Sequence, residues 1–429
     1  MEKLAIFGGS PVRTKPYLSH VTTGGEEKQA VMKVMDRGIL SEYEGTNNQY
    51  FMGGLEVQAL EKEWAAFFGV KYALAVNSAT SGLFAAAGAC GFGPGDEVIA
   101  TPFTMSATPS AILAYNAIPV FADVDPVTFN LDPDDVERKI TPRTKAIYVV
   151  HIFGHPAPMD HIMAIAKKHG LKVVEDAAQS PMAKFGDKYT GGLGDLGVFS
   201  LNCNKHIQCG EGGIVTTNDD TLAERVALIR NHAEAVINSG RKFDSLVSML
   251  GWNYRMNEIE AAISREQLKK LPTLLEERLV LVEHLNRRVR DVGGYFIPAV
   301  KPGTTHVYYR YGLLLDPAIW QGVKAPQVVK ALNAEGMDFY VSYMKPLYRQ
   351  PLYRQQTLFG DKGCPFACPF YKGKVNYAEG ICPVAENLEN VLISTEIVRP
   401  KQTLEDMDEI AVALKKVLAR KDQVKSIAV

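Results

Sequence analysis

Long apolar runs are missing from this sequence, and their absence excludes several classes of protein. No uninterrupted stretch approaches the roughly 20 residues that a membrane-spanning helix needs. The opening residues 1–9 lack the apolar region of a secretory signal peptide. The 429 residues contain no low-complexity tract and no repeat with a period of about 20 to 50 residues. We therefore expect a cytoplasmic protein without a membrane partner.

Neither sign of charge is in excess. The chain has 47 basic and 48 acidic residues, which give a formal net charge of −1. Such a balance creates no broad positive surface for the phosphates of a nucleic acid or for an anionic membrane. The sequence thus predicts no nucleic-acid partner and leaves room only for local anion sites.

Cysteine is also scarce. Six cysteines in 429 residues are too few for a disulfide scaffold, which fits a reducing compartment. Cys364, Cys368 and Cys382 lie close together, but no histidine follows at a spacing useful for zinc, so we expect no metal site. Cys203 and Cys209 are expected to be small buried hydrophobic residues.

Strand-like and helix-like segments alternate through the first half of the chain. The expected helices cover residues 55–68, 82–90, 106–115 and 159–169, and the expected strands cover 72–76, 97–100, 119–122, 145–150 and 172–175. The apolar runs of these strands do not alternate with polar residues, so both faces of the sheet are expected to be buried. This pattern predicts a mostly parallel sheet covered by helices on both sides.

A chain of this length is too long for one small core, so two domains are expected. A helix over 256–271 is expected to end at Pro272, and a charged helix follows to about Arg290. We place the boundary there, with a large domain over 1–272 and a small α+β domain over 273–429. The small domain is predicted to contain strands within 306–315 and 339–342, a helix over 407–418 and a frayed tail after Arg420.

Polar groups follow three of the expected strands, at the edge where open α/β sheets bind ligands. Ser78 to Ser81 lies between a strand and a helix, where it either caps the helix or holds a phosphate at the helix N-terminus. Asp176 is either a turn cap or a carboxylate paired with a protonated pyridine nitrogen, with Gln179 within reach of a ring hydroxyl. The third group consists of Ser200, Lys205 and Gly210, Gly212 and Gly213.

Lys205 is the strongest catalytic candidate. Most of the 47 basic residues must be solvated surface charges, but apolar Val198-Phe199 precede Lys205 and Ile214-Val215 follow the glycines. Burial lowers the pKa of a lysine amine and makes it nucleophilic near neutral pH. A pyridoxal phosphate (PLP) site needs such an amine for a Schiff base, a carboxylate for the pyridine nitrogen, and hydroxyl and N–H groups for the phosphate.

In their order and spacing these motifs resemble the PLP-dependent sugar and aminocyclitol aminotransferases of the DegT/DnrJ/EryC1/StrS family. The resemblance is carried by residues 7–13, 77–83, 93–99, 173–180, 194–200, 205, 210–213, 251–257 and 382–386. It implies fold type I of the PLP-dependent transferases, in which a large domain with a mixed, mostly parallel sheet is followed by a smaller α+β domain. It also implies a homodimer with shared active sites.

The resemblance also implies roles for single residues. Lys205 would form the Schiff base, Asp176 would bind the pyridine nitrogen, and Gln179 would bind the ring hydroxyl. The implied phosphate ligands are Ala79, Thr80 and Ser200, together with Asn253 reaching across the dimer. Taken without the resemblance, Asn253 reads as a loop residue before a helix.

Two positions depart from the family pattern. Met105 stands where an aromatic residue usually stacks on the pyridine ring, and Phe103 would point the same way in an extended segment, so both are candidates. Ala79 replaces a common glycine but keeps its N–H group.

The resemblance implies an aminotransferase that moves an amino group from glutamate or glutamine to a ketone on a sugar or cyclitol ring. Residues 7–13 and 382–386 favour the subgroup that acts on keto-cyclitols and related antibiotic precursors. Two alternatives stay open, a dehydratase of the same fold, in which histidine replaces the lysine, and a non-catalytic sensor or scaffold. Candidate substrate contacts are Tyr43, His151, Tyr343 and Tyr348.

Overall fold

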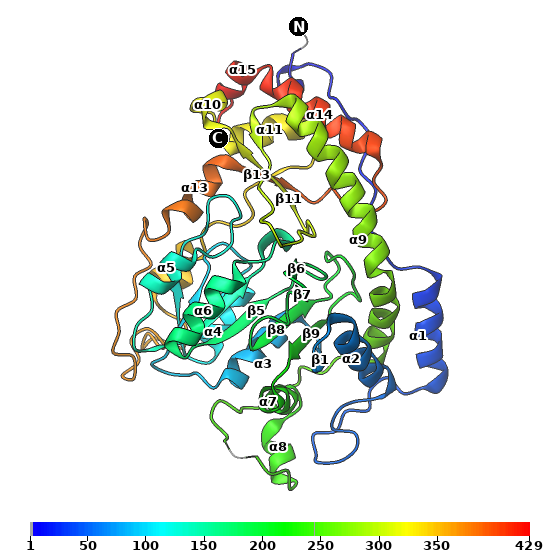
Figure 1. The fold of residues 1–429 in the computed structure, drawn as a ribbon, viewed down its shortest axis with the longest axis vertical. Coiled ribbons are helices and arrows are strands. Elements are labelled where there is room, and N and C mark those ends of the chain that lie inside the picture. Colours follow the sequence, from blue (N-terminus) through cyan, green and yellow to red (C-terminus); the bar gives the residue numbers. More distant parts are fainter. Residues whose placement is uncertain (1–2, 244) are drawn as a thin grey trace.

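A seven-stranded sheet forms the centre of the computed structural model, which describes residues 3–243 and 245–429 (Figure 1). In spatial order its strands are β1 (Tyr72–Val76), β9 (Gly213–Thr217), β8 (Leu196–Ser200), β5 (Lys172–Asp176), β4 (Thr144–Val150), β2 (Glu97–Ala100) and β3 (Ile118–Phe121). β9 is antiparallel to both of its neighbours, and all other pairs are parallel. The predicted mostly parallel sheet is confirmed.

Helices cover both faces of this sheet, as the uninterrupted apolar strands predicted. Successive strand residues enter opposite cores: Val98 and Ala100 pack on one face, and Ile99 packs on the other. The first face carries α3 (Ala79–Cys90), α4 (Ala107–Ala114) and α7 (Asp220–Arg230), and the second carries α2 (Leu55–Phe68), α5 (Pro133–Arg138), α6 (Met159–His169) and part of α9 (Glu258–Val292). In residues 3–243 and 245–429, none of the helices is both long and apolar enough to cross a bilayer.

A second sheet of four antiparallel strands organises the C-terminal part. Its order is β10 (Tyr295–Phe296), β11 (Tyr311–Leu315), β13 (Leu392–Thr395) and β12 (Tyr340–Val341). The helices of this part are α10 (Pro317–Trp320), α11 (Ala325–Ala334), α12 (Pro351–Gln355), α13 (Pro383–Val391), α14 (Leu404–Leu418) and α15 (Lys421–Lys425). The predicted strands over 306–315 and 339–342 are present in shorter form, whereas β10 and β13 were not predicted.

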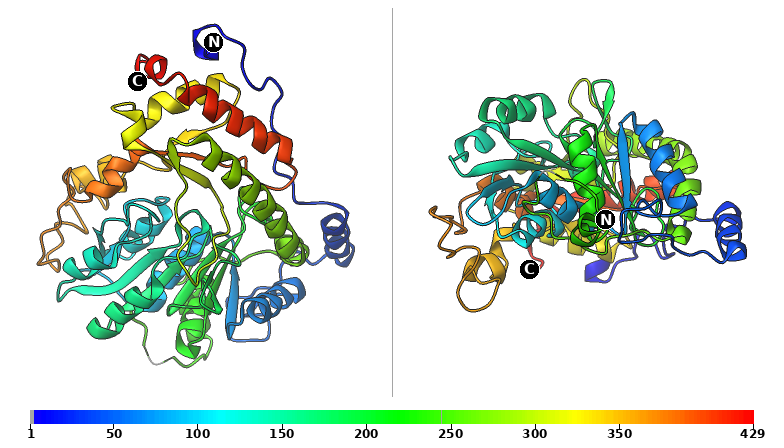
Figure 2. Two further views of the ribbon diagram at one scale, coloured as in Figure 1. Left: turned by 45° about the horizontal axis from the view of Figure 1, so that its top comes forward. Right: turned by 90° about the horizontal axis from the view of Figure 1, so that it is seen from below.

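The remaining elements are short or peripheral. They are α1 (Gly25–Arg37), α8 (Ala233–Asn238), the two-stranded β6 (Lys184–Phe185) and β7 (Lys188–Tyr189), and the 3-10 turns η1 (Ala5–Phe7), η2 (Ile152–Gly154) and η3 (Leu347–Arg349). Helix α1 lies outside α9, away from the sheet (Figures 1 and 2).

Helix α9 contradicts the predicted break at Pro272. It runs without interruption over 35 residues and contains that proline. A proline inside a helix removes one N–H donor, but here the helix packs along two cores, which offsets the loss. Leu268 and Leu271 belong to the core beneath the large sheet, whereas Leu281 and Leu285 belong to the core of the small sheet. The predicted division at 272/273 therefore falls inside a helix that joins both parts (Figure 1), and the division itself stays a prediction.

Both chain ends pack on the C-terminal core. Leu4 is fully buried there, and Arg13 donates to Asp406 (2.8 Å) and to Glu409. The predicted boundary groups this N-terminal segment with the large domain, although these contacts tie it to the small one. The frayed tail was a wrong prediction, because Val424 and Ile427 are buried in the same core.

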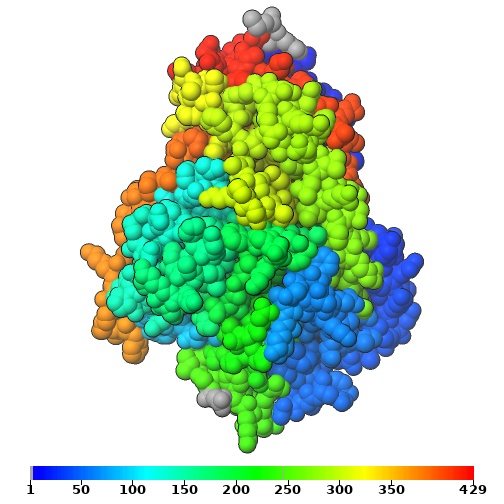
Figure 3. All heavy atoms as spheres, in the orientation of Figure 1, coloured from blue at the N-terminus to red at the C-terminus, as the bar shows by residue number. Residues whose placement is uncertain are grey.

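Residues 304–309 form a second connection between the two parts. They lie between β10 and β11 of the small sheet but contact the large-sheet part, where the N–H groups of Val307 and Tyr309 donate to the carbonyls of Gly154 (3.0 Å) and Phe153 (2.7 Å). In Figure 3 this part of the chain is yellow and lies at the junction of the two parts, on the face shown. This segment brings Tyr309 to the edge of the large sheet.

A buried ion pair provides a test of the core. The guanidinium of Arg230, with no exposed side-chain surface, donates to Glu61 (2.5 Å) and to the carbonyl of Ala75 (2.8 Å). Glu61→Gln leaves the buried cation without its counter-charge, so we expect the free energy of unfolding in urea to fall by about 3–5 kcal/mol.

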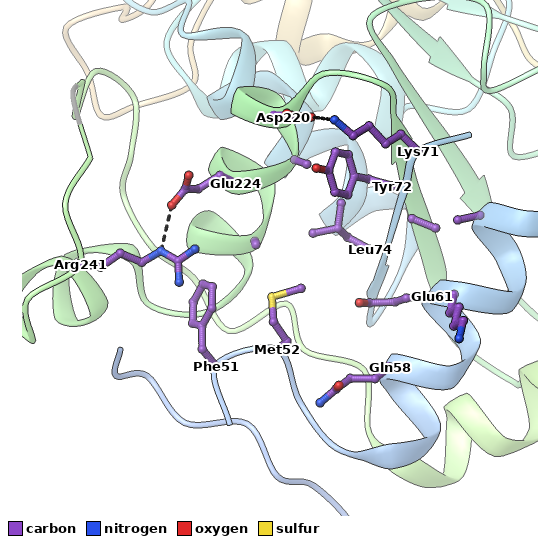
Figure 4. A pocket seen from close by; sticks show the side chains of 15 residues that line it. Phe51, Met52, Gln58, Glu61, Lys71, Tyr72, Leu74, Asp220, Glu224 and Arg241 are labelled. Atoms are coloured by element: carbon purple, nitrogen blue, oxygen red, sulfur yellow. Dashed lines mark hydrogen bonds and ion pairs between the residues drawn. The ribbon is translucent and has the colours of Figure 1, made fainter. Parts of the chain in front are cut away.

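The matched control is Glu224→Gln, which removes the partly exposed pair between Glu224 and Arg241 (2.9 Å; Figure 4). That change is expected to stay below about 1 kcal/mol. Equal losses in the two variants would contradict a role for the Arg230 pair in the core.

Candidate active site

The predicted site residues meet where β5, β8 and α3 come together. β5 ends at Asp176 and β8 ends at Ser200, and the two strands run parallel with Asp176 beside Val198. Residues 201–212 then form a loop between β8 and β9, in which the N–H of Lys205 donates to the carbonyl of Asn202 (2.9 Å). Both side chains thus lie at the carboxyl edge of the sheet, where ligands bind in this class of fold.

Asp176 is a buried carboxylate with two different partners. Its Oδ2 accepts a hydrogen bond from the hydroxyl of Thr108 on α4 (2.7 Å), and its Oδ1 accepts one from the N–H of Ala178 (3.1 Å). The second bond is the turn cap considered in the sequence. The first holds the carboxylate in place from another helix, and Thr108 carries no local motif that would have revealed it.

Lys205 is half-buried, and its surroundings change its acidity. Burial lowers the pKa of the amine to about 8, although the carboxylates of Asp176 and Glu396 act to raise it and Arg310 acts to lower it. Lys205 Nζ lies 4.3 Å from the centre of the Tyr309 ring. The expected fall of the lysine pKa is confirmed, and the amine is electrostatically coupled to Asp176.

The start of α3 combines a cap with free N–H groups. Ser78 is the N-cap, and its Oγ accepts from the N–H of Ser81 (3.1 Å), so the capping interpretation is confirmed. The helix begins at Ala79 rather than at residue 82. The N–H groups of Ala79 and Thr80 have no acceptor within the helix, and the positive end of the helix dipole favours an anion there.

Gly213 allows the strand end with Ser200 to lie close to the start of α3. Ser200 pairs with Gly213 between β8 and β9. A Cβ atom on Gly213 would lie 2.6 Å from the nitrogen of Ala79, which is too close for any other residue without a shift of the backbone. The hydroxyl of Ser200 and the first turn of α3 therefore belong to one edge that can hold a phosphate.

Gln179 connects the large-sheet part of the structure with the C-terminal part. Its Oε1 accepts from the N–H of Phe153 (2.7 Å), and its Nε2 donates to the hydroxyl of Tyr343 (3.3 Å). Burial raises the pKa of Tyr343 to about 12, so the phenol stays protonated at neutral pH. Tyr343 is the one predicted substrate contact that lies beside the other site residues.

The C-terminal part adds charged groups that sequence reasoning missed. The guanidinium of Arg310 lies 5.0 Å from the ring centre of Tyr343 and forms an ion pair with Glu396 (2.5 Å). Arg310 and Glu396 are far from Lys205 in the sequence and match no motif, so no signal indicated them.

Met105 and Phe103 point into different surroundings. Phe103 is completely buried among aromatic rings, with Phe129 and Phe153 about 6 Å away (6.3 and 6.1 Å). Met105 is 52% exposed. Residues 102–104 form bends rather than an extended strand, so the expectation that both side chains point the same way is wrong. Of the two, only Met105 is accessible to a ligand.

Two of the suggested substrate contacts are buried against other partners. His151 has no exposed surface and lies 2.9 Å from Glu175, and its Nδ1 accepts from the N–H of Ala157 (3.0 Å). Tyr348 donates to Glu386 (2.5 Å) inside the C-terminal part. These two suggestions are corrected, because both side chains are occupied by structural hydrogen bonds.

Tyr43 is likewise buried, beneath the guanidinium of Arg230 (5.0 Å), which corrects the third suggestion. The cysteines near Lys205 differ from each other. Cys209 is buried as predicted, but Cys203 is exposed, because the loop turns it outward. Within residues 3–243 and 245–429, no group of three or more histidine, cysteine or acidic side chains is arranged to hold a metal.

The loop with Asn253 lies next to the start of α3. The N–H of Asn77 donates to the carbonyl of Tyr254 (2.8 Å), and Asn231 forms a bridge with Asn253. The loop therefore has hydrogen-bond partners within its own chain. The side chain of Asn253 is exposed, and its Oδ1 accepts from Nε of Arg255 (2.8 Å).

A cavity of about 620 Å³ lies elsewhere, between α2, β1 and α7 (Figure 4). Four of its charged side chains form two ion pairs, Lys71 with Asp220 and Arg241 with Glu224. None of the predicted site residues lines it. We therefore place the candidate site at the edge of the sheet, on the chemistry of its residues.

Comparisons with known proteins identify the family of the chain. Residues 43–376 match the model of the DegT/DnrJ/EryC1/StrS aminotransferase family. The chain is 35% identical over 354 residues to the spore coat polysaccharide biosynthesis protein SpsC of Bacillus subtilis, which covers 81% of this chain and 88% of that protein. It is 33% identical over 429 residues to L-glutamine:2-deoxy-scyllo-inosose aminotransferase of Streptoalloteichus tenebrarius, with 97% of each chain covered.

Among solved structures, DesI in the presence of its TDP-sugar product superposes with a TM-score of 0.81 at 26% identity and covers 98% of this chain and 97% of its own. The chain belongs to the DegT/DnrJ/EryC1/StrS aminotransferase family. It is a PLP-dependent aminotransferase with the fold type I architecture.

The residues at the sheet edge fit this cofactor. Asp176 offers a buried, oriented carboxylate, and Lys205 offers an amine whose pKa is about 8. The start of α3 offers N–H groups for a phosphate beside the hydroxyl of Ser200. Each chemical part of PLP thus has a matching group in the described residues.

The low pKa of Lys205 can be measured by lysine labelling of the cofactor-free protein. An amine with a pKa of about 8 is protonated and unreactive below that pH, so labelling should rise through pH 8, well below an ordinary lysine. Asp176→Asn removes a carboxylate that raises this pKa and should move the midpoint to lower pH. Peptide mass analysis after pulse labelling reads each site, with exposed Lys145 as the internal control. A shift to higher pH in the variant would contradict the coupling.

Proposed function

We propose that this aminotransferase moves an amino group from glutamate or glutamine to a ketone on a sugar or cyclitol ring. The observation that carries the proposal is the coupling of the low-pKa amine of Lys205 to the buried carboxylate of Asp176, next to an anion-holding helix start. The relative from Streptoalloteichus, named for glutamine and an inosose and matched over nearly its whole length, supports a keto-cyclitol as acceptor.

When bound, PLP supplies an electron sink that stabilises negative charge at the carbon bearing the amino group. Asp176, held by Thr108, keeps a proton on the ring nitrogen, because a buried carboxylate is stabilised by an adjacent positive charge. Gln179 orients the ring hydroxyl from its place between Phe153 and Tyr343. Met105 is the accessible side chain for packing on the ring face.

Lys205 is the group that would move the proton. With a pKa of about 8, part of its amine is unprotonated at neutral pH, so it would accept a proton from the amino-bearing carbon of the donor and would deliver it to carbon C4′ of the cofactor. Ala79, Thr80 and Ser200 hold the phosphate, which fixes the position of the ring while the proton moves. On the other side of the site, Arg310, Glu396 and Tyr343 offer donors and acceptors for a polyol.

A dehydratase of the same fold is the second candidate, and the site disfavours it. Such relatives carry histidine in place of the lysine, whereas Lys205 is present. The neighbouring His206 is fully buried, and its Nε2 donates to the carbonyl of Val307 (2.9 Å). It is therefore a structural residue that does not replace the lysine. A non-catalytic sensor or scaffold role is also disfavoured, because such a role does not require Lys205 to be electrostatically coupled to Asp176.

We also propose a homodimer in which Asn253 reaches the phosphate of the partner's cofactor. The support is a group of exposed apolar side chains that precedes Asn253 in the chain, namely Leu246, Val247, Leu250 and Trp252, which are 42–61% exposed. Exposed apolar surface of this kind is typical of a protein interface. As location we propose the reducing cytoplasm, which the six free cysteines support.

The lysine assignment is tested by Lys205→Ala. Formation of the amine from a panel of keto-cyclitols and keto-sugars, read by mass with glutamine and glutamate as donors, should fall by at least about 10²-fold, because the proton-transfer group is lost. Exposed Lys145→Ala should retain the parent rate. A Lys205→Ala variant with near-parental turnover and unchanged thermal stability would refute the role.

Shared active sites are tested by subunit exchange. One inactive variant carries Lys205→Ala, and the other carries Asn253→Ala and Arg255→Ala. If the sites are shared, a mixed dimer has one site with both lesions and one with neither, so mixing should restore about a quarter of the parental activity at equal amounts of the two chains.

The control is each variant incubated alone, which should stay inactive. If mixing restores no activity although exchange is demonstrated by native mass spectrometry, each site is built from one chain, and the shared-site proposal fails.

A further inference from the structure

Two of the six cysteines lie in a segment that plays no part in the proposed reaction. Residues 357–381 run from α12 to α13 along the outer edge of β3, at the left of Figures 1 and 3. The hydroxyl of Tyr371 donates to Glu97 (2.9 Å), and the hydroxyl of Tyr377 donates to the carbonyl of Pro119 (2.7 Å). These two hydrogen bonds attach the second half of the segment to the large sheet. Cys364 and Cys368 lie just before Tyr371, the first of the two attached residues.

The backbone folds Cys364 and Cys368 onto one turn. The N–H of Ala367 donates to the carbonyl of Gly363 (2.8 Å), and that of Cys368 donates to Pro365 (3.3 Å). Cys364 and Cys368 therefore stand at the two ends of one hydrogen-bonded turn. A disulfide needs a Cβ separation of about 3.5–4.5 Å, and closing it requires movement only within this turn.

The two thiols also influence each other. Burial, together with the neighbouring thiol of Cys368, raises the pKa of the Cys364 thiol. Both side chains are half-buried and free, so a small solute reaches them. The residue between them that holds the turn is Phe366, which is 7% exposed and packs edge-on against Tyr377 (5.8 Å).

The other four cysteines differ in this respect. Cys209 and Cys382 are buried, and burial raises the pKa of Cys90 to about 12. Cys203 is exposed but has no second thiol among its contacts in the described residues. A metal is disfavoured at the pair, because no third ligand completes a cluster in residues 3–243 and 245–429.

We propose that Cys364 and Cys368 are a redox modification site, which a peroxide converts reversibly into a disulfide. The thiolate of one cysteine attacks a peroxide oxygen, the O–O bond breaks, and a sulfenic acid and one water (or alcohol) form. The second thiol attacks the sulfenic sulfur, the S–O bond breaks, and a second water leaves as the S–S bond forms. Two thiols are oxidised and one peroxide is reduced, and a dithiol reductant reverses the change.

This disulfide closes a ring of five residues inside a turn that Phe366 and the backbone already hold. Closing so short a loop removes little entropy from the unfolded chain, so the modification alters reactivity far more than stability. A disulfide within reach of solvent is also the kind that is readily reduced again.

The test uses the full-length, PLP-loaded enzyme. The protein is reduced, freed of reductant, treated with hydrogen peroxide at a few equivalents, alkylated and mapped by peptide mass. We expect the peptide that contains both cysteines to lose the mass of two hydrogen atoms and both alkylation sites, and dithiothreitol to restore them. Cys364→Ser and Cys368→Ser should each abolish this product, whereas Cys203→Ser should leave its yield unchanged.

Three outcomes would overturn the proposal. The peptide stays doubly alkylated while exposed Cys203 is oxidised, or Cys364 and Cys368 oxidise separately to sulfinic or sulfonic acid, or either of them pairs with a different cysteine. Circular dichroism of the two serine variants verifies that both are folded, so a missing product reports chemistry and not unfolding.

Discussion

The buried negative charge of Asp176 must be compensated by the groups that surround it. A charge at the end of an apolar strand is costly unless other groups compensate it. Thr108 and the N–H of Ala178 satisfy its oxygens in the protein, and the amine of Lys205 lies within its field. The neighbouring loop, the start of α3 and the bridging residues 304–309 are arranged so that a cationic ring can complete this compensation.

Where sequence reasoning succeeded, the information was local. Five of the seven strands of the large sheet were predicted to within one residue at each end, because each is a short apolar run bounded by turn residues. Asp176, Lys205 and the start of α3 were identified because the ends of neighbouring parallel strands meet at one edge. Even the lowered pKa of Lys205 followed from the apolar residues on either side of its loop.

Where it failed, the deciding contacts joined distant parts of the chain. Pro272 reads as a helix end, but α9 packs against two cores that no local pattern reveals. Arg310 and Glu396 act on the site from the C-terminal part of the chain, so nothing near Lys205 in the sequence pointed to them. His151 and Tyr348 were suggested by residue type alone, and type does not show that a partner already occupies the side chain.

Gly213 shows how a residue without a side chain limits the variation that this enzyme tolerates. Its Cα faces the nitrogen of Ala79 so closely that even a methyl group would push strand and helix apart. A Gly213→Ala protein would fold around the same core but carry the turn that we propose for the phosphate in a displaced position. Mutational scanning would then record position 213 as essential, although the residue performs no chemistry and touches no substrate.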